Sequence, residues 1–168
     1  QDCREYKYFP NTIIQTVSQV TLVNSLAAIK KVVFDEKKAT MSDLVAALKR
    51  NWEGYEELRQ MCLNAPKFGN DDDYVDLLAR DVYLRTAQTF RSFKNIWGGP
   101  FMEDGTAGSS YFNHSGFTGA TADGRKDRDI FNDGTISPVI GTDKKGPTAV
   151  LQSVAKIDHA RTMTHLLN

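Results

Sequence analysis

The first hundred residues alternate hydrophobic and polar positions mostly with the spacing of amphipathic helices. Apolar residues recur every three or four positions in four separate stretches, with charged or polar residues between them. Thr40 followed three residues later by Asp43 has the pattern of a capping box, and the acids at 71–73 suit a helix N-terminus. These patterns predict helices over 24–33, 40–48, 55–63 and 70–97.

The remaining stretches have a different pattern. Residues 8–22 are rich in β-branched side chains and are predicted to be extended, as a strand and a loop. Most of the chain's twelve glycines lie between 101 and 148, where we expect loops and short strands, including a strand over 112–121. Residues 149–157 fit either a helix or a strand. Helices that alternate with short extended segments place the chain in the α/β class.

Composition and charge exclude several classes of function. The chain has 168 residues, of which 40% are hydrophobic and 25% charged, as in globular domains. Its 21 basic and 21 acidic residues balance, so we expect no binding to nucleic acid or to an anionic membrane. No apolar run has the length of a transmembrane span, and the first residues do not resemble a signal peptide. Cys3 and Cys62 give neither metal-ligand spacing nor a disulfide framework, and the predicted location is cytoplasmic.

Several long motifs follow one another along nearly the whole chain. Four turn-rich motifs lie close together: Ala-Asp-Gly-Arg-Lys at 122–126, Asp-Gly-Thr-Ile-Ser-Pro at 133–138, Gly-Thr-Asp at 141–143 and Gly-Pro-Thr-Ala-Val-Leu at 146–151. Three precede them: Asn-Ser-Leu-Ala-Ala-Ile-Lys-Lys at 24–31, Asn-Trp-Glu-Gly-Tyr-Glu at 51–56 and Asn-Ala-Pro-Lys-Phe-Gly-Asn-Asp-Asp-Asp-Tyr at 64–74. In this order the motifs resemble the C-terminal part of the catalytic subunit of glycyl radical enzymes, the pyruvate formate-lyase-like group.

The resemblance implies a ten-stranded α/β barrel built from two five-stranded halves. It implies a thiyl-forming cysteine on a central loop and a glycyl radical on a C-terminal loop. The radical is installed by an activase that uses S-adenosylmethionine and an iron–sulfur cluster. Enzymes of this group are several times longer, so residues 1–168 are interpreted as a fragment of the C-terminal half of the barrel domain. Neither the thiyl-cysteine loop nor the glycyl radical domain is expected in it.

We therefore expect this chain alone to be inactive. Cys3 is followed by Glu5 in a Cys-x-Glu arrangement, but it lies in the wrong place for the thiyl cysteine. The implied partners are the rest of the catalytic subunit, the activase and a small organic substrate. The parent enzyme is expected to be a homo-oligomer.

Five polar residues on two extended segments are candidates for contact with that substrate. The resemblance implies that Tyr111, Asn113 and His114 lie on a barrel strand and loop that line the substrate cavity. Each of them can hydrogen-bond a carboxylate or hydroxyl. Asn11 and Gln15 lie on the other extended segment, where alternate side chains of a barrel strand point inward.

Arg125 is a sixth candidate, because a guanidinium suits a substrate carboxylate. The Asp-Gly-Arg turn that contains it also suits a structural role, with the arginine paired to a carboxylate. The acids at 71–73 are interpreted as a charged helix cap rather than a metal site, since they lack the spaced loop of a calcium site. The aromatic residues Trp52, Phe90, Phe93 and Trp97 are expected in the core.

The reaction is narrowed only in part. Residues 129–134 replace a Gly-Glu-Pro-Leu-Ala-Asp-Gly run common in diol dehydratase-like members, and residues 1–12 look more like alkyl- and arylalkylsuccinate synthases or arylacetate decarboxylases. The leading expectation is addition of a hydrocarbon to fumarate, with arylacetate decarboxylation or a diol dehydratase-like reaction as alternatives. A non-catalytic stand-alone fragment or subunit is an alternative of another class.

Overall fold

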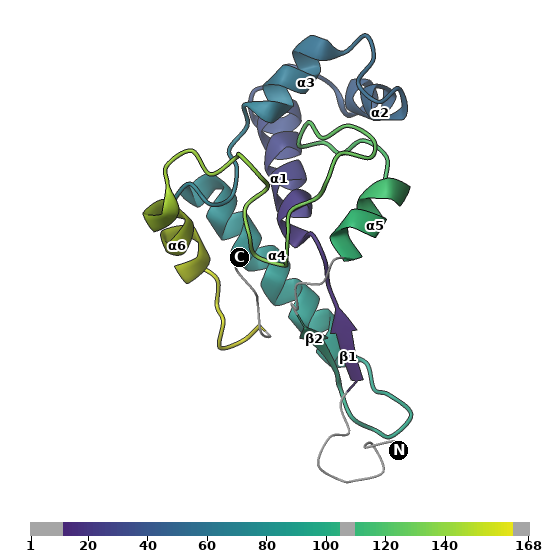
Figure 1. The fold of residues 1–168 in the computed structure, drawn as a ribbon, viewed down its shortest axis with the longest axis vertical. Helices are drawn as coiled ribbons and strands as arrows, with labels where there is room; N and C mark the ends of the chain where they lie inside the picture. Colours follow the sequence, from purple (N-terminus) through teal and green to yellow (C-terminus); the bar gives the residue numbers. More distant parts are fainter. Residues whose placement is uncertain (1–11, 105–109, 163–168) are drawn as a thin grey trace.

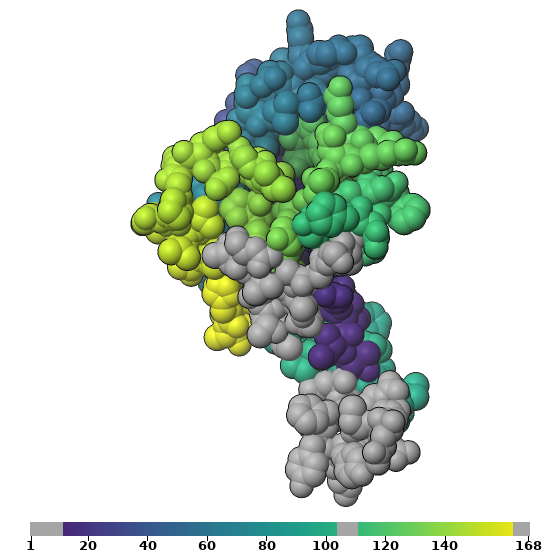
Figure 2. Space-filling model, viewed as in Figure 1, coloured from purple at the N-terminus to yellow at the C-terminus, as the bar shows by residue number. Residues whose placement is uncertain are grey.

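The computed structural model describes residues 12–104 and 110–162 of the chain (Figure 1). In chain order its elements are β1 (Thr12–Gln15), α1 (Gln19–Ile29), the π-helical turn η2 (Lys30–Asp35), α2 (Met41–Lys49), α3 (Glu56–Leu63), α4 (Asp73–Ser92), β2 (Phe101–Asp104), α5 (Ser110–Phe117) and α6 (Pro147–Ala155). The helices α1 and α4 pack together at the centre, with α2 and α3 at one end and the two strands at the other (Figure 1). The long connection from α5 to α6 covers much of one face (Figure 2).

The strands β1 and β2 form a parallel pair, with Thr12 opposite Phe101 and Gln15 opposite Asp104. Parallel strands require a crossover connection, and the helices from α1 to α4 supply it here. Because α4 also packs against β2, the helical layer and the two strands form one unit. This is an α/β piece with a two-stranded sheet.

Two hydrophobic clusters hold the helices together. The first lies between α1 and α4 and contains Val20, Val23, Ala27, Phe68, Val75, Ala79, Tyr83, Ile136 and Ile157. The second joins the far end of α1 to α2 and α3 and contains Ala28, Val32, Leu44, Ala47, Trp52, Leu58, Cys62, Ala65 and Ala122. Both include residues that follow α5, so the glycine-rich region is packed into the core rather than lying apart from it.

The helix starts predicted from the sequence are confirmed at α2 and α4. At α2, Thr40 Oγ1 accepts from the Asp43 backbone N–H at 3.1 Å and Asp43 Oδ2 accepts from the Thr40 N–H at 2.9 Å, which completes the capping box. At α4, Asp72 Oδ1 accepts from the Tyr74 N–H at 3.0 Å. The helix predicted over 55–63 is present as α3, and residues 149–157 lie mostly in α6.

Other predicted boundaries are wrong. The strand expected over 8–22 is described only as Thr12–Gln15, and α1 begins at Gln19 instead of Asn24. The β-branched residues Val20 and Val23 are buried against α4, so tertiary packing overrides their preference for a strand.

The end of α4 also differs from the prediction. The helix ends at Ser92, and Phe93 (59% exposed) and Trp97 (44% exposed) lie outside the core in which they were expected. Beyond the helix, the side chain of Asn95 fixes a turn, since its Oδ1 accepts from the backbone N–H groups of Trp97 at 3.0 Å and Gly99 at 2.9 Å. This is the local turn chemistry for which asparagine is favoured. Trp52, by contrast, is buried as predicted.

The strand predicted over 112–121 is a helix for most of its length. The helix α5 spans Ser110–Phe117. Two side chains bond back to carbonyls one turn earlier: Ser115 Oγ donates to Tyr111 O at 2.6 Å, and Thr118 Oγ1 donates to His114 O at 2.8 Å. These bonds satisfy the two hydroxyl groups locally, so a helix accommodates them at these positions. In the part of the chain that the structure describes, no helix is long and apolar enough to cross a membrane.

Candidate functional site

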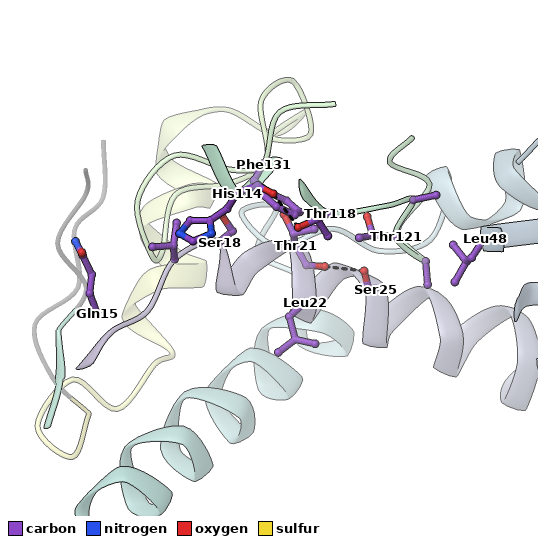
Figure 3. A pocket seen from close by; sticks show the side chains of 13 residues that line it. Gln15, Ser18, Thr21, Leu22, Ser25, Leu48, His114, Thr118, Thr121 and Phe131 are labelled. Atoms are coloured by element: carbon purple, nitrogen blue, oxygen red, sulfur yellow. Dashed lines mark hydrogen bonds between the residues drawn. The ribbon is translucent and has the colours of Figure 1, made fainter. Parts of the chain in front are cut away.

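A cavity of about 610 Å³ lies where the β1–α1 junction meets the segment that follows α5. Its lining comes from β1, α1, α2, α5 and the segment after α5 (Figure 3): Gln15, Val17, Ser18, Thr21, Leu22, Ser25, Leu48, His114, Thr118, Ala120, Thr121, Ala122 and Phe131. In Figure 3, Gln15 is at one end, Leu48 at the other, and His114 lies beside Ser18. The volume is in the range of small-molecule sites.

The wall of this cavity combines hydroxyl groups with apolar side chains. Several hydroxyls donate to fixed partners within the protein: Thr21 Oγ1 to Asn132 Oδ1 at 3.1 Å, Ser25 Oγ to Thr21 O at 2.8 Å, and Thr121 Oγ1 to Asp123 Oδ1 at 2.6 Å. A hydroxyl whose proton is committed keeps lone pairs that can accept from a ligand. The cavity therefore offers acceptors in fixed positions, next to the imidazole of His114.

The backbone at Ser18 is held in an unusual conformation. Ser18 has a φ of 63° and a ψ of 30°, the left-handed region that non-glycine residues rarely adopt. Its N–H donates to Gly134 O at 3.4 Å, and the Thr21 N–H donates to Asn132 Oδ1 at 3.2 Å. Contacts from residues 132–134 thus hold the β1–α1 junction in place at the cavity wall, and backbone strain of this kind often accompanies a functional site.

Beside the cavity, a buried carboxyl group joins β2 to the same junction. Glu103 is completely buried, and its Oε1 accepts from Thr16 Oγ1 at 2.8 Å and from Gln19 Nε2 at 2.7 Å. Among the described residues, the second oxygen, Oε2, has no hydrogen-bond partner, and neither has Gln19 Oε1. Burial raises the pKa of Glu103 above its ordinary value, and the hydrogen bonds from Thr16 and Gln19 oppose part of that shift. A proton on Oε2 would supply the donor that these two oxygens lack.

We expect the substitution Glu103→Gln to stabilise the protein at neutral pH, by about 1–2 kcal/mol, because it places an amide donor beside Gln19 without a charge. A carboxyl whose folded pKa is raised loses stability as pH rises from its unfolded pKa to its folded one. The advantage of the variant should therefore grow with pH through that window, measured as Tm from pH 4 to pH 8. The exposed Glu53→Gln serves as the matched control. A variant that is less stable than the wild type at pH 7 would contradict this view of Glu103.

Of the six residues predicted to contact substrate, the structure brings Gln15 and His114 to one cavity. Asn11 lies outside the described residues. Asn113 is exposed on α5, and Tyr111 lines a different cavity, beside Asp133 and Ser137. The exposed or half-buried positions of these residues follow from α5 being a helix, which turns 111, 113 and 114 toward different sides.

Arg125 anchors the loop beneath the cavity. Its Nη1 donates to Lys126 O at 2.8 Å and to Asp129 O at 2.7 Å, and its Nη2 donates to Thr118 O at 2.8 Å and to Gly119 O at 2.6 Å. The guanidinium also lies 4.1 Å from the ring centroid of Phe131. Carbonyl oxygens, and not the carboxylate expected from the sequence, are its partners. This geometry supports the structural alternative, and the substrate role stays a prediction.

The turn that carries Arg125 is in turn fixed to the α2–α3 connection. Trp52 Nε1 donates to Arg125 O at 3.0 Å, and Arg59 Nε donates to Gly124 O at 2.8 Å. Gly124 has a φ of +100°, and a Cβ there would come within 2.6 Å of the Leu63 side chain, so only glycine fits. Cys62, which lies in α3, is buried, and burial raises the pKa of its thiol to about 11. A thiol in that state is structural, as expected from the sequence.

The sequence reasoning missed most of the cavity wall. Ser18, Thr21 and Ser25 were not candidates, because residues 8–22 were predicted to be extended and the helix was predicted to begin only at Asn24. Their spacing of three and four residues places them on one face of a helix, so a correct prediction of α1 would have grouped them. Thr118 and Thr121 carry no signal of their own, since loop threonines are common.

Comparison with known proteins places this geometry in a family. A sequence model of the family described as pyruvate formate lyase-like matches residues 2–113. Among curated proteins, the chain is 38% identical over 156 residues to trans-4-hydroxy-L-proline dehydratase of Clostridioides difficile, covering 92% of this chain and 20% of that protein. It is 41% identical over 136 residues to isethionate sulfite-lyase of Nitratidesulfovibrio vulgaris, covering 79% of this chain and 16% of that protein.

Solved structures give the same result. The glycerol-bound form of the B12-independent glycerol dehydratase from Clostridium butyricum superposes with a TM-score of 0.87 and 41% identity, over 94% of this chain and 20% of that one. The hydroxyproline dehydratase from Clostridioides difficile with its substrate bound gives the same TM-score of 0.87 at 38% identity, over the same shares of the two chains. The chain thus belongs to the pyruvate formate lyase-like family of glycyl radical enzymes. It spans about a fifth of the length of these relatives.

Proposed function

We propose that the chain is the part of a glycyl radical enzyme that forms one wall of the substrate cavity, and that the enzyme eliminates a small group from a hydroxylated substrate. The observation that carries this proposal is the cavity itself, whose wall presents Ser18, Thr21, Thr118, Thr121 and His114 over an apolar floor. Such a wall can fix the orientation of a small molecule that carries both hydroxyl and hydrocarbon groups.

The relatives support an elimination. The named relatives act as dehydratases or as a sulfite-lyase, and two solved relatives hold trans-4-hydroxy-L-proline and glycerol. A decarboxylase is also similar, since the chain is 29% identical to the glycyl radical subunit of 4-hydroxyphenylacetate decarboxylase from Clostridium scatologenes, covering 92% of this chain and 20% of that protein. The addition of a hydrocarbon to fumarate stays a prediction that none of these relatives supports.

The chemistry of the radical belongs to the parent enzyme. A glycyl radical, installed by an activase that uses S-adenosylmethionine and an iron–sulfur cluster, would supply abstraction of a hydrogen atom from the substrate. The described residues fit a role in substrate binding rather than in radical formation, because Cys62 is buried with a raised pKa and does not line the cavity. What this chain's residues do is bind, orient and exclude water around the substrate's polar groups.

The proposal is tested on the full-length protein that carries this chain, treated anaerobically with an activase. We expect an organic radical signal by electron paramagnetic resonance, followed by dehydration of glycerol, 1,2-propanediol or trans-4-hydroxy-L-proline, or release of sulfite from isethionate. Parallel incubations contain 4-hydroxyphenylacetate, and fumarate with toluene. A radical signal with carbon dioxide or a succinate adduct as product would replace elimination by one of the alternatives, and an activated protein without a radical signal would refute the assignment altogether.

Substitution of His114 by alanine is expected to raise KM for the accepted substrate about tenfold, because a single hydrogen bond of ~1.4 kcal/mol corresponds to that factor. Protein stability should change little, since His114 is exposed at the cavity mouth. The matched control is His159→Ala, an exposed imidazole beyond the end of α6 that does not line the cavity. Equal KM values for the two variants would show that the cavity is not where substrate binds.

A further inference from the structure

A second cavity, of about 440 Å³, lies between the end of α3 and the loop that precedes α6. It shares no lining residue with the candidate site. Its lining consists of Leu63, Asn64, Ala65, Lys67, Asn70, Gly141, Thr142, Lys144 and Lys145. Three of these nine residues are lysines and none is acidic, although the chain as a whole carries equal numbers of basic and acidic residues.

The two lysines of the loop are free to take a ligand. Within the described ranges neither Lys144 nor Lys145 forms an ion pair, and both are exposed. The neighbouring Asp143 lines a different cavity and is absent from the lining of this one. Among the described residues, therefore, no carboxylate pairs with either ammonium group.

The loop that carries these lysines is held in one conformation. Asn70 Nδ2 donates to Thr142 O at 2.8 Å, and Asn70 Oδ1 accepts from the Lys145 N–H at 3.2 Å. Thr142 closes the turn with its own N–H and hydroxyl, which both donate to Val139 O, at 2.9 and 2.7 Å. Because the backbone is fixed in this way, less conformational entropy is lost when the loop binds a ligand.

The third lysine forms the half-buried floor of the cavity. Lys67 Nζ donates to Cys62 O at 2.7 Å and to Ala65 O at 3.0 Å. These bonds satisfy the carbonyl groups at the end of α3 and leave the ammonium group with a third N–H donor. Burial lowers the pKa of Lys67 to about 8, and the charge of Asp123 opposes part of that shift. The protein alone thus stabilises the charged form of this side chain only weakly, and a bound anion would stabilise it further.

Asn64 adds a neutral donor at the rim. Its Oδ1 accepts from Gln60 Nε2 at 3.0 Å, which orients the amide and leaves the Nδ2 group as a donor. Ammonium and amide donors that converge on one space, with no acid among them, form a site for a multiply charged oxyanion. The cavity is larger than a single phosphate ion, and Leu63 supplies an apolar wall beside the donors.

We propose that this cavity is a binding site for a phosphate group, held by Lys67, Lys144 and Lys145 with the amide of Asn64. The group can come from inorganic phosphate or from the phosphate monoester of a small organic molecule, whose organic part would lie against Leu63. The assignment is independent of the elimination proposed for the other cavity.

The test is a calorimetric titration of the full-length protein with inorganic phosphate and, separately, with glycerol 3-phosphate. We expect saturable binding of at least one of them, weakened about tenfold or more in Lys144→Gln/Lys145→Gln, which removes two charge-assisted contacts. The matched control is Lys49→Gln/Arg50→Gln, a tandem of exposed basic residues at the end of α2, which should bind as the wild type does. Tighter binding of the monoester would identify an organic phosphate as the ligand, and equal binding would identify phosphate itself.

Proton uptake on binding tests the same site if the double variant is unstable. Binding should raise the pKa of Lys67, so titration at pH 8.5 should take up protons and the measured heat should depend on the ionisation enthalpy of the buffer. In Lys67→Met that proton uptake should be lost. The groups that face Lys67 are Cys62, Asp123 and the two loop lysines. Binding that is absent, or equally weak in wild type, control and double variant, would overturn the assignment.

Discussion

Replacement of Lys156 by methionine is expected to destabilise the protein by about 3 kcal/mol at neutral pH, the lower end of the usual cost of removing one partner of a buried ion pair, since Asp76 is buried but the lysine is partly exposed. The Lys156 ammonium lies 2.7 Å from Asp71 Oδ1, 2.7 Å from Asp73 Oδ1 and 2.9 Å from Asp76 Oδ2. Asp76 is completely buried, and Ser153 Oγ donates to the same oxygen at 3.0 Å. The cluster joins the start of α4 to the end of α6, so its loss would release α6 from the core.

The loss should depend on pH with a definite sign. Burial raises the pKa of Asp76, while the Lys156 ammonium and the Ser153 hydroxyl oppose that shift. Without the lysine the folded pKa rises further, so the variant loses stability with increasing pH over a wider window. Urea unfolding from pH 3 to pH 7 should show a small difference from wild type at pH 3, where Asp76 is protonated in both states, and the full difference at pH 7.

Two further variants separate the buried charge from other causes. Lys156→Met/Asp76→Asn should recover at least half of the loss, because the uncompensated carboxylate is gone. Lys49→Met removes an exposed lysine that forms no ion pair in the described part of the chain, and should stay within about 0.5 kcal/mol of wild type. A loss below about 1 kcal/mol for Lys156→Met would mean that the cluster is solvated and contributes little.

The accuracy of the sequence-based fold depended on whether the deciding interactions were local. The capping box of Thr40 and Asp43 involves residues three positions apart, and it was predicted correctly. The start of α1 was not, because Val20 and Val23 favour a strand until α4, some fifty residues later in the chain, buries them. The ten-stranded barrel came from the resemblance, and this chain by itself shows one parallel pair of strands.

The candidate site was predictable only where single residue types carried the signal. Gln15 and His114 were chosen as polar groups on segments near a cavity, and the structure places both at its wall. The hydroxyls of Ser18 and Thr21 could not be chosen, since their position depends on contacts with Asn132 and Gly134 more than a hundred residues away. Long-range contacts of this kind leave no trace in local hydrophobic periodicity.

The substitution Arg125→Lys distinguishes the two roles assigned to that residue. A lysine has its donors on one nitrogen and cannot reach the two pairs of carbonyls that the guanidinium fork reaches at Lys126, Asp129, Thr118 and Gly119. Buried carbonyls left without donors cost about 1–3 kcal/mol each, partly offset where water enters. We therefore expect Arg125→Lys to lower stability by about 3 kcal/mol and Arg125→Met by more.

The readout that decides between the roles is the relation of Tm to KM. If Arg125 positions the loop, Arg125→Lys lowers Tm and raises KM together, because the backbone of Thr118 and the ring of Phe131 both belong to the cavity wall. If Arg125 binds a substrate carboxylate, Tm stays at the wild-type value and KM alone rises. Arg128→Lys is the matched control, since Arg128 lies on the same loop, is exposed, and contacts Asp127 at 3.9 Å. A stable Arg125→Lys protein with a raised KM would mean that Arg125 binds the substrate. The loop would then be held by other contacts, such as the hydrogen bonds from Trp52 and Arg59.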